Sequence, residues 1–292
     1  MKKGVLAVVG ASVLYGIMPV FTKKIMLEGM NSASTVFFRV LLASLFSLIY
    51  IKIKGISLKV TKQQLLQLAI FGGFAFGSTA ALLTASYSYI PIGLATMLHF
   101  TYPLFVTIVM TVVFKERLSP AKVLSCLMAI GGLGLMADFS RLSLVGIVLA
   151  VVSGMTYAIY VISNKKGSFA SLEGIVVIFY VNGFAALVFG TKAVVTKEFM
   201  LPTSGFCVFL LIIVAIFCTI IALLLLTSGV RTLGASNAAV LNMLEPITSV
   251  FAGLIFYHEV IGFAGFMGCV LVIMSSIVVA TESGKQRVKA KE

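Results

Sequence analysis

Ten apolar stretches, each long enough to cross a lipid bilayer, alternate with short polar connectors along this chain. They cover roughly residues 4–22, 33–51, 64–89, 92–114, 119–137, 142–163, 174–191, 205–230, 233–257 and 260–281. A helix needs about 20 apolar residues to cross the hydrocarbon core. It also satisfies all its backbone hydrogen bonds within one segment, as lipid requires. The sequence therefore predicts an all-α integral membrane protein with ten transmembrane helices.

The composition excludes a water-soluble protein. Of the 292 residues, 60% are hydrophobic and only 11% are charged, a balance that is foreign to soluble domains of this length. A net charge of +13 would suggest nucleic acid as the partner of a soluble protein. Here the basic residues lie in connectors, where they orient helices in a membrane. We therefore expect the lipid bilayer, and no nucleic acid, as a partner.

The cysteines indicate neither disulfides nor a metal site. Cys126, Cys207, Cys218 and Cys269 stand singly in apolar stretches, without a CxxC pair and without a histidine at ligand spacing. We expect them to be packing residues, and we expect no cofactor. Because the sequence also lacks a phosphate loop and a nucleophile elbow, we expect a protein that is not an enzyme.

The second half of the chain repeats the first. A shift of 143 positions brings Pro246 onto Pro103 and Glu259 onto Glu116, and a shift of 142 brings Tyr157 onto Tyr15. A nearly constant offset across a whole half indicates duplication. We predict two five-helix repeats, residues 4–137 and 142–281, followed by a basic cytoplasmic tail at 282–292.

The distribution of Lys and Arg predicts the topology. One set of connectors and ends contains Lys2, Lys3, Lys52, Lys54, Lys59, Lys62, Lys115, Arg117, Lys122, Lys165, Lys166, Arg231, Lys285, Arg287, Lys289 and Lys291. The other set contains only Lys23, Lys24, Arg141, Lys192 and Lys197. The positive-inside rule places the richer set, with both termini, in the cytoplasm. Because each half has an odd number of helices, the halves form an inverted repeat, a common basis for alternating access.

These features resemble the EamA-type transporters of the drug/metabolite transporter (DMT) superfamily. The resemblance rests on two five-helix halves, the segment FFRVLLA at 37–43, and two helices that carry a proline and a terminal glutamate. It covers about residues 4–280. It implies a multi-pass carrier of the plasma membrane with a central cavity lined mainly by helices one, three, four, six, eight and nine. Arg39 of FFRVLLA has no counterpart in the second half, where Val181 or Asn182 stands.

The ninth stretch carries polar residues inside a membrane-spanning length. Asn242, Glu245 and Ser249 are spaced three and four apart and share one helix face. Pro246 has no N–H, so we expect it to break the helix and to free the carbonyl of Asn242. An ionisable group at this depth is a candidate functional residue. Glu245 either exchanges protons or binds a substrate cation; the alternative is a structural acid bonded to a neighbouring helix.

The fourth stretch carries the matching positions. His99 corresponds to Asn242, Tyr102 corresponds to Glu245, and Pro103 is predicted to break the helix and free the carbonyl of His99. A histidine here either relays protons near neutral pH or satisfies backbone groups that the proline opens. We predict that Glu245 and His99 belong to one polar site near the middle of the membrane.

Three further residues are candidates for the substrate pathway. Tyr15 and Tyr157 are repeat counterparts, and Pro19 is predicted to free the carbonyl of Tyr15 and break the first helix. Internal tyrosines either cradle amphiphilic or cationic ligands or pack between helices. Arg39 either binds a substrate carboxylate through its planar guanidinium or snorkels or pairs with a backbone carbonyl.

Other polar and small residues are expected to be structural. Glu116 and Glu259 follow apolar runs, where helix capping or pairing with Lys115, Arg117 or His258 explains them. The fifth and tenth stretches carry small residues that allow close packing, either as a scaffold or as a homodimer contact. These are Ala121, Ser125, Ala129, Ala264 and Gly268.

The sequence as a whole predicts a carrier. We expect it to move a small-molecule substrate by alternating access, as an exporter of amino acids or related metabolites, with proton coupling through Glu245. The alternatives are an uptake permease of the same fold and a non-transporting membrane receptor or assembly protein. Proline-broken polar faces in both halves favour transport, because a receptor does not need them.

Overall fold

The structure is a computed structural model that describes residues 2–86, 89–90, 92–116, 119–136, 143–257 and 262–289. In these ranges every regular element is a helix. The first half contains α1 (Lys2–Leu27), α2 (Ser32–Lys54), α3 (Lys62–Gln67), η1 (Leu68–Phe74), α4 (Ala75–Ser86), α5 (Ile92–His99), α6 (Tyr102–Val112) and α7 (Pro120–Met136). The second contains α8 (Leu144–Lys166), η2 (Ser168–Ser171), α9 (Gly174–Val195), α10 (Gly205–Ala215), η3 (Ile216–Ile221), α11 (Ala222–Leu233), α12 (Ala235–Leu241), α13 (Leu244–Tyr257) and α14 (Phe263–Lys289).

Helix occupies each of the ten predicted stretches in the part of the chain that the structure describes. Seven helical segments are long and apolar enough to cross a membrane. Three shorter apolar helices, Tyr102–Val112, Pro120–Leu135 and Phe263–Val278, lie in the fourth, fifth and tenth stretches. The all-helical membrane architecture is therefore confirmed, whereas the number of ten crossings stays a prediction.

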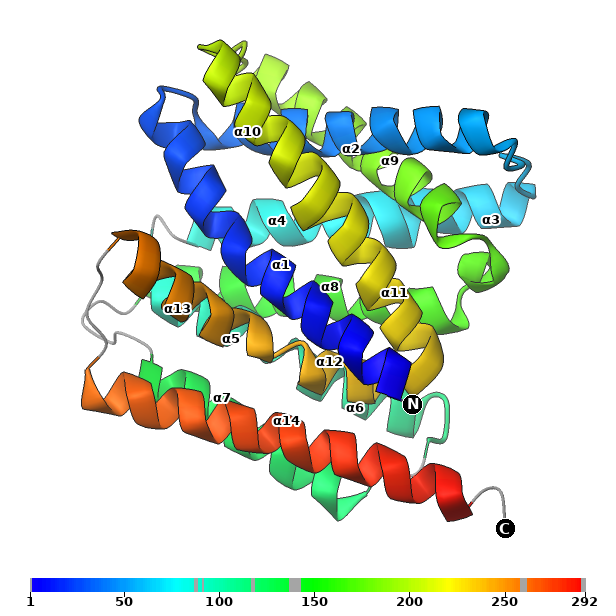
Figure 1. The fold of residues 1–292 in the computed structure, drawn as a ribbon, viewed down its shortest axis with the longest axis vertical. Helices are drawn as coiled ribbons and strands as arrows, with labels where there is room; N and C mark the ends of the chain where they lie inside the picture. The colour runs from blue at the N-terminus through cyan, green and yellow to red at the C-terminus, as the bar shows by residue number, and fades with distance from the viewer. Residues whose placement is uncertain are drawn as a thin grey trace.

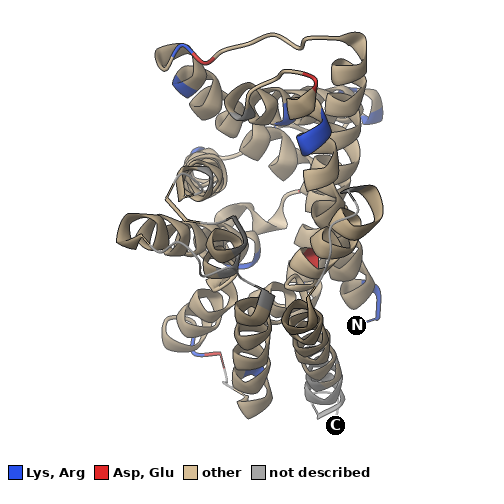
Figure 2. Cartoon of the chain, turned by 90° about the vertical axis from the view of Figure 1, so that its left-hand side faces the viewer, with Lys and Arg blue, Asp and Glu red and all other residues tan. Residues whose placement is uncertain are grey.

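The helices lie side by side, and their ends gather at two opposite faces (Figure 1). The start of α1 and the end of α14 lie at the same face, together with the α2–α3 connection, while the α1–α2 connection lies at the other (Figure 1). Long parts of the helices carry no charged residue (Figure 2). This is the distribution that a bundle surrounded by lipid requires, because charged side chains are costly there.

Four helix pairs make the most extensive contacts. α7 packs along α14, α2 along α9, α1 along α11, and α8 along α4. Small residues permit a close approach of α7 and α14, since a Cβ on Gly132 of α7 would lie 2.6 Å from the carbonyl oxygen of Gly268 in α14. The fifth and tenth predicted stretches thus pack against each other within the chain, and the largest buried apolar cluster is formed mainly by the central helices α1, α6, α8, α9, α11 and α12.

Local signals set the helix ends on the connectors. The side-chain oxygen of Asn31 accepts a hydrogen bond of 2.8 Å from the backbone N–H of Ser34 and caps α2. Gly55 ends α2 with φ of 64°, a left-handed conformation that glycine adopts without steric cost. Thr61 and Gln64 then form a reciprocal capping box at the start of α3. A turn between α2 and α3 is therefore specified by adjacent residues alone.

Pro19 does not break its helix, contrary to the prediction, whereas Pro103 and Pro246 stand at the predicted helix breaks. α1 runs through Pro19 without interruption, because the surrounding turns retain their bonds and a helix tolerates a single lost bond when its neighbours pack against it. Pro103 and Pro246 instead stand in the first turns of α6 and α13, where a missing N–H costs nothing. Two π-helical segments, η1 and η3, also interrupt the third and eighth stretches, and no feature of the apolar pattern predicts them.

Candidate functional site

Two broken helices meet at the centre of the bundle. The first break separates α5 from α6, and the second separates α12 from α13. α12 packs on α6, α1 packs on α13, and α8 packs on both α5 and α6. Glycines allow these approaches: a Cβ on Gly16 of α1 would lie 2.7 Å from the carbonyl oxygen of Glu245, and one on Gly154 of α8 would lie 2.7 Å from that of His99. The break between α5 and α6 therefore lies against α8, and the break between α12 and α13 lies against α1.

Asn242 is the centre of a hydrogen-bond network between these elements. Its side chain is fully buried. Its Nδ2 lies 3.2 Å from the hydroxyl of Tyr102 and 3.2 Å from Oε2 of Glu245. Its Oδ1 accepts a hydrogen bond of 3.1 Å from Ser12 Oγ on α1. One amide thus connects α1, α6 and α13.

Glu245 is the carboxylate of this network and is only partly buried. Its side chain accepts from Asn242, and its carbonyl oxygen accepts from Ser249 Oγ at 3.3 Å. Tyr15, Tyr102 and Tyr157 all lie within electrostatic range of it. A carboxylate that is surrounded by hydroxyls and amides, yet still accessible, is able to accept a proton or to contact a cationic ligand.

The carbonyl of Asn242 is not free, contrary to the prediction from Pro246. It accepts a hydrogen bond of 3.0 Å from the backbone N–H of Glu245. The tighter turn between α12 and α13 supplies this donor at three residues' distance in place of the one the proline lacks. The polar character of this site therefore comes from side chains more than from an open backbone group.

His99 lies on the other side of Tyr102. Its Nδ1 is 2.9 Å from Ser153 Oγ of α8, and the serine hydroxyl is also 2.6 Å from the carbonyl oxygen of Ala150. The ring of His99 lies 5.9 Å from that of Tyr102 and 5.4 Å from that of Tyr157, measured between centroids. His99 thus reaches Glu245 through Tyr102 and Asn242, and no hydrogen bond joins His99 to Glu245 within the described residues.

Aromatic rings continue from this point along α8. The centroids of Tyr102 and Tyr157 are 4.7 Å apart in an edge-to-face arrangement. Tyr157 is followed by Tyr160 at 6.0 Å, and Tyr160 by Phe76 of α4 at 5.2 Å. Edge-to-face contacts are favourable for aromatic pairs, and their faces suit cations. The centre of the bundle therefore combines an aromatic wall with a carboxylate.

Tyr15 and Arg39 present polar groups that lack partners. The buried hydroxyl of Tyr15 and the Nε of Arg39 have no hydrogen bond within the described part of the chain. Arg39 donates through Nη1 to the sulfur of Met18 at 2.8 Å, and a thioether is only a weak acceptor. Tyr15 lies within electrostatic range of both Arg39 and Glu245. Buried polar groups are usually bonded, so these two are candidates for bonds to a ligand.

Three members of this site were not singled out from the sequence: Ser12, Ser153 and Tyr160. A signal for them exists, because residues three or four apart share a helix face. Ser12 precedes Tyr15 by three positions, Ser153 precedes Tyr157 by four, and Tyr160 follows it by three. Helical spacing around the two predicted tyrosines would have found all three.

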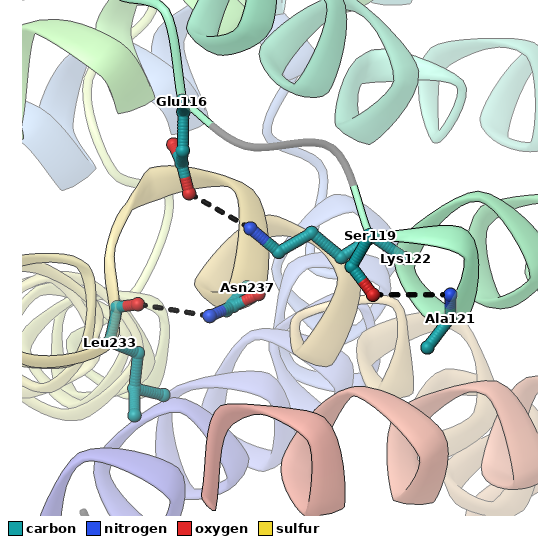
Figure 3. Close-up of polar contacts among 6 residues, drawn as sticks. All are labelled: Glu116, Ser119, Ala121, Lys122, Leu233 and Asn237. Atoms are coloured by element: carbon teal, nitrogen blue, oxygen red, sulfur yellow. Dashed lines mark hydrogen bonds and ion pairs between the residues drawn. The ribbon is translucent and has the colours of Figure 1, made fainter. Parts of the chain in front are cut away.

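A separate ion pair joins α7 to the end of α6 (Figure 3). Lys122 Nζ lies 2.9 Å from Oε1 of Glu116. Pairing with Lys115 was one of the explanations expected for Glu116, and the partner that the structure shows is Lys122; Lys115 has a left-handed backbone with φ of 53°. Arg117, and also Glu259 and His258, lie outside the described residues. No group of three His, Cys, Asp or Glu side chains suited to a metal occurs in the ranges described.

Known proteins place the chain in a family. The sequence model of the EamA-like transporter family matches residues 2–137 and again residues 144–281. A solved structure titled "Crystal structure of protein" has a TM-score of 0.83 with 15% sequence identity, covering 96% of this chain and 98% of that one. A search of curated proteins finds no match. Because the family match spans both halves, the resemblance seen in the sequence is confirmed, and the chain belongs to the EamA-like transporter family of multi-pass membrane proteins.

Proposed function

We propose that this protein is a proton-linked carrier that exports amino acids or related zwitterionic metabolites across the plasma membrane by alternating access. The observation that carries the proposal is the central cluster of Asn242, Glu245 and Tyr102, with the unpartnered groups of Tyr15 and Arg39 beside it. Polar groups of this kind are costly inside a membrane protein unless they serve transport or pairing.

The two charged side chains support a zwitterionic substrate. Arg39 offers a planar donor group that matches a carboxylate, and its Nε has no protein partner in the described chain. Glu245 and the neighbouring tyrosine faces suit an ammonium group. Tyr15 lies in electrostatic range of both Arg39 and Glu245. One small solute with a carboxylate and an ammonium group would therefore pair with both side chains.

Glu245 supplies the proposed proton coupling. A neutral carboxyl is far less costly to bury than a carboxylate. Glu245 would therefore release its proton when the site opens to water and binds the ammonium group, and take up a proton when the solute leaves. The rings of His99 and Tyr102 are in contact, and we assign both residues to the substrate pathway with Asn242, Tyr15, Tyr157 and Arg39.

The packing supports alternating access between inverted halves. The α1–α11 pair of the structure has a counterpart in α8–α4, and these pairs exchange under the repeat shift, while α2–α9 and α7–α14 map onto themselves. The start of α1 and the end of α14 lie at one face, which agrees with an even number of crossings (Figure 1). We assign that face to the cytoplasm from the positive-inside rule, with five helices in each of the repeats 4–137 and 142–281.

Counterflow in proteoliposomes tests this function. The purified protein is loaded with an unlabelled solute, and uptake of labelled zwitterions, amines without a carboxylate and acids without an amine is compared. We expect saturable exchange of at least one neutral amino acid and much weaker exchange of its single-charge analogues. Absence of exchange across a broad panel by folded protein would contradict the carrier proposal. Net movement in vesicles of known orientation then distinguishes export from uptake.

A further inference from the structure

Ser12 of α1 contacts the site from a helix that carries none of the predicted network apart from Tyr15. Its side chain is fully buried. Its Oγ lies 3.1 Å from Oδ1 of Asn242 and 3.0 Å from the carbonyl oxygen of Val8. A hydroxyl has one proton to donate. Because the Val8 carbonyl also has the helical N–H four residues on as a donor, the hydroxyl proton is available to Asn242.

By donating its proton to Oδ1, Ser12 favours one direction of the Asn242 amide. With Oδ1 on Ser12, Nδ2 faces both Tyr102 and Glu245. Tyr102 donates its own proton to the carbonyl oxygen of Ala239 at 3.2 Å, so its oxygen accepts from Asn242. Every donor in the chain from Ser12 through Asn242 to Glu245 then has an acceptor.

If the Asn242 amide pointed the other way, its donors and acceptors would no longer match those of its neighbours. Oδ1 of Asn242 would then face the carboxylate of Glu245 and the oxygen of Tyr102, placing acceptors against acceptors. Because the hydroxyl proton of Tyr102 is donated to the carbonyl oxygen of Ala239 and a carboxylate has no proton, only a protonated Glu245 would donate to Oδ1 in that arrangement. The amide direction and the charge of Glu245 are therefore coupled through Asn242.

We infer that Ser12 is a positioning residue that fixes the amide direction of Asn242 and thereby favours the ionised form of Glu245 that meets the substrate. The inference rests on the proposed function for the part that Glu245 plays in transport. Its structural part, the effect of Ser12 on Glu245 through Asn242, stands on the hydrogen bonds alone.

The other groups that face Glu245 do not duplicate this role. Tyr15 from α1, Tyr102 from α6 and Tyr157 from α8 lie in electrostatic range, and tyrosine is ordinarily neutral across the working pH range. Arg39 from α2 acts on Tyr15 and stays charged at every such pH. His99 from α5 is a titratable residue type as well. The test therefore requires a signal that belongs to Glu245 itself.

Infrared difference titration of the reconstituted protein provides that signal. A protonated carboxyl has its own C=O stretching band, and loss of the band in Glu245→Gln assigns it. In Ser12→Ala we expect the pH at which the band reaches half intensity to rise by roughly 0.5 to 1 pH unit, the effect of one lost hydrogen bond on an ionised group. The acid limb of the transport profile should move equally.

Matched variants make the outcome decisive. Ser47→Ala removes another buried serine hydroxyl, on α2, that has no hydrogen-bond partner among the described residues, and should leave the half-intensity pH unchanged. Ser12→Cys keeps the side-chain size with a weaker donor and should give a smaller rise than Ser12→Ala; it decides the matter if Ser12→Ala does not fold. A wild-type half-intensity pH in the folded Ser12 variants would overturn the inference. Wild-type transport by Glu245→Gln would instead refute the proposed coupling, without touching the infrared result.

Discussion

Removing the charge of Glu116 should destabilise the protein, because it leaves a buried ammonium group unpaired. Lys122 Nζ lies 2.9 Å from Glu116 Oε1, and their side chains are 5% and 31% exposed. Breaking a fully buried pair costs about 3–5 kcal/mol. Water reaches the glutamate here, and glutamine retains an acceptor oxygen, so we expect about 1–2 kcal/mol for Glu116→Gln.

The matched control is the exposed pair of Lys24 and Glu28. Lys24 Nζ lies 3.5 Å from Glu28 Oε1, and the two side chains are 49% and 30% exposed. An exposed pair four residues apart on a helix contributes about 0.3–0.5 kcal/mol, so Glu28→Gln should change the free energy of unfolding by no more than that.

Reversible unfolding in mixed micelles of increasing SDS content measures both variants. Helix content from circular dichroism is the suitable probe, because the chain contains no Trp. The double variant Glu116→Gln/Lys122→Met should recover much of the lost stability, since no buried charge is then left unpaired. Equal, small shifts for Glu116→Gln and Glu28→Gln would refute the reasoning.

Two further predictions concern packing and topology. Gly16→Ala should lower stability by about 1–3 kcal/mol in the same unfolding assay, because its Cβ would overlap Thr248 and the backbone of α13. The control Gly131→Ala on α7, where a Cβ meets nothing within 4 Å, should not lower stability. Equal losses in the two variants would show that the contact is unimportant. Cysteines placed at Lys54 and Ser283 should react with an impermeant thiol reagent only from the cytoplasmic side, and one at Lys197 only from outside; reaction of Lys54 and Lys197 positions from one side would contradict the inverted five-plus-five topology.

Much of the architecture could be predicted from apolar length and repetition alone. Helix ranges followed because lipid leaves a spanning segment few alternatives to a helix. The offsets that join Pro103 to Pro246 also indicated two breaks in matched helices. The continuity of α1 through Pro19 could not be predicted, because it depends on the packing that surrounds the residue.

Site membership was easier to predict from sequence than the contacts within the site. Asn242 and Tyr102 were both expected, yet the sequence gives no distance that would show one amide bonded to both Tyr102 and Glu245. Lys122 was assigned only to a cytoplasmic connector, although it pairs with Glu116 in the structure. Such pairings depend on three-dimensional proximity, which spacing along the chain does not contain.

The central claim is that Glu245 carries the proton that drives transport, and the pH profile of counterflow tests it most directly. Glu245→Gln keeps the shape of the side chain but cannot exchange a proton, so folding and membrane insertion should stay intact. We predict a loss of transport of about tenfold or more, as expected when a charge-assisted contact worth about 1.5–3 kcal/mol is removed, and a flat pH profile for the residual activity. Glu28→Gln should behave as wild type, and His99→Gln should lose less than Glu245→Gln. Wild-type rate and pH dependence in Glu245→Gln would contradict the claim and make Glu245 a structural acid.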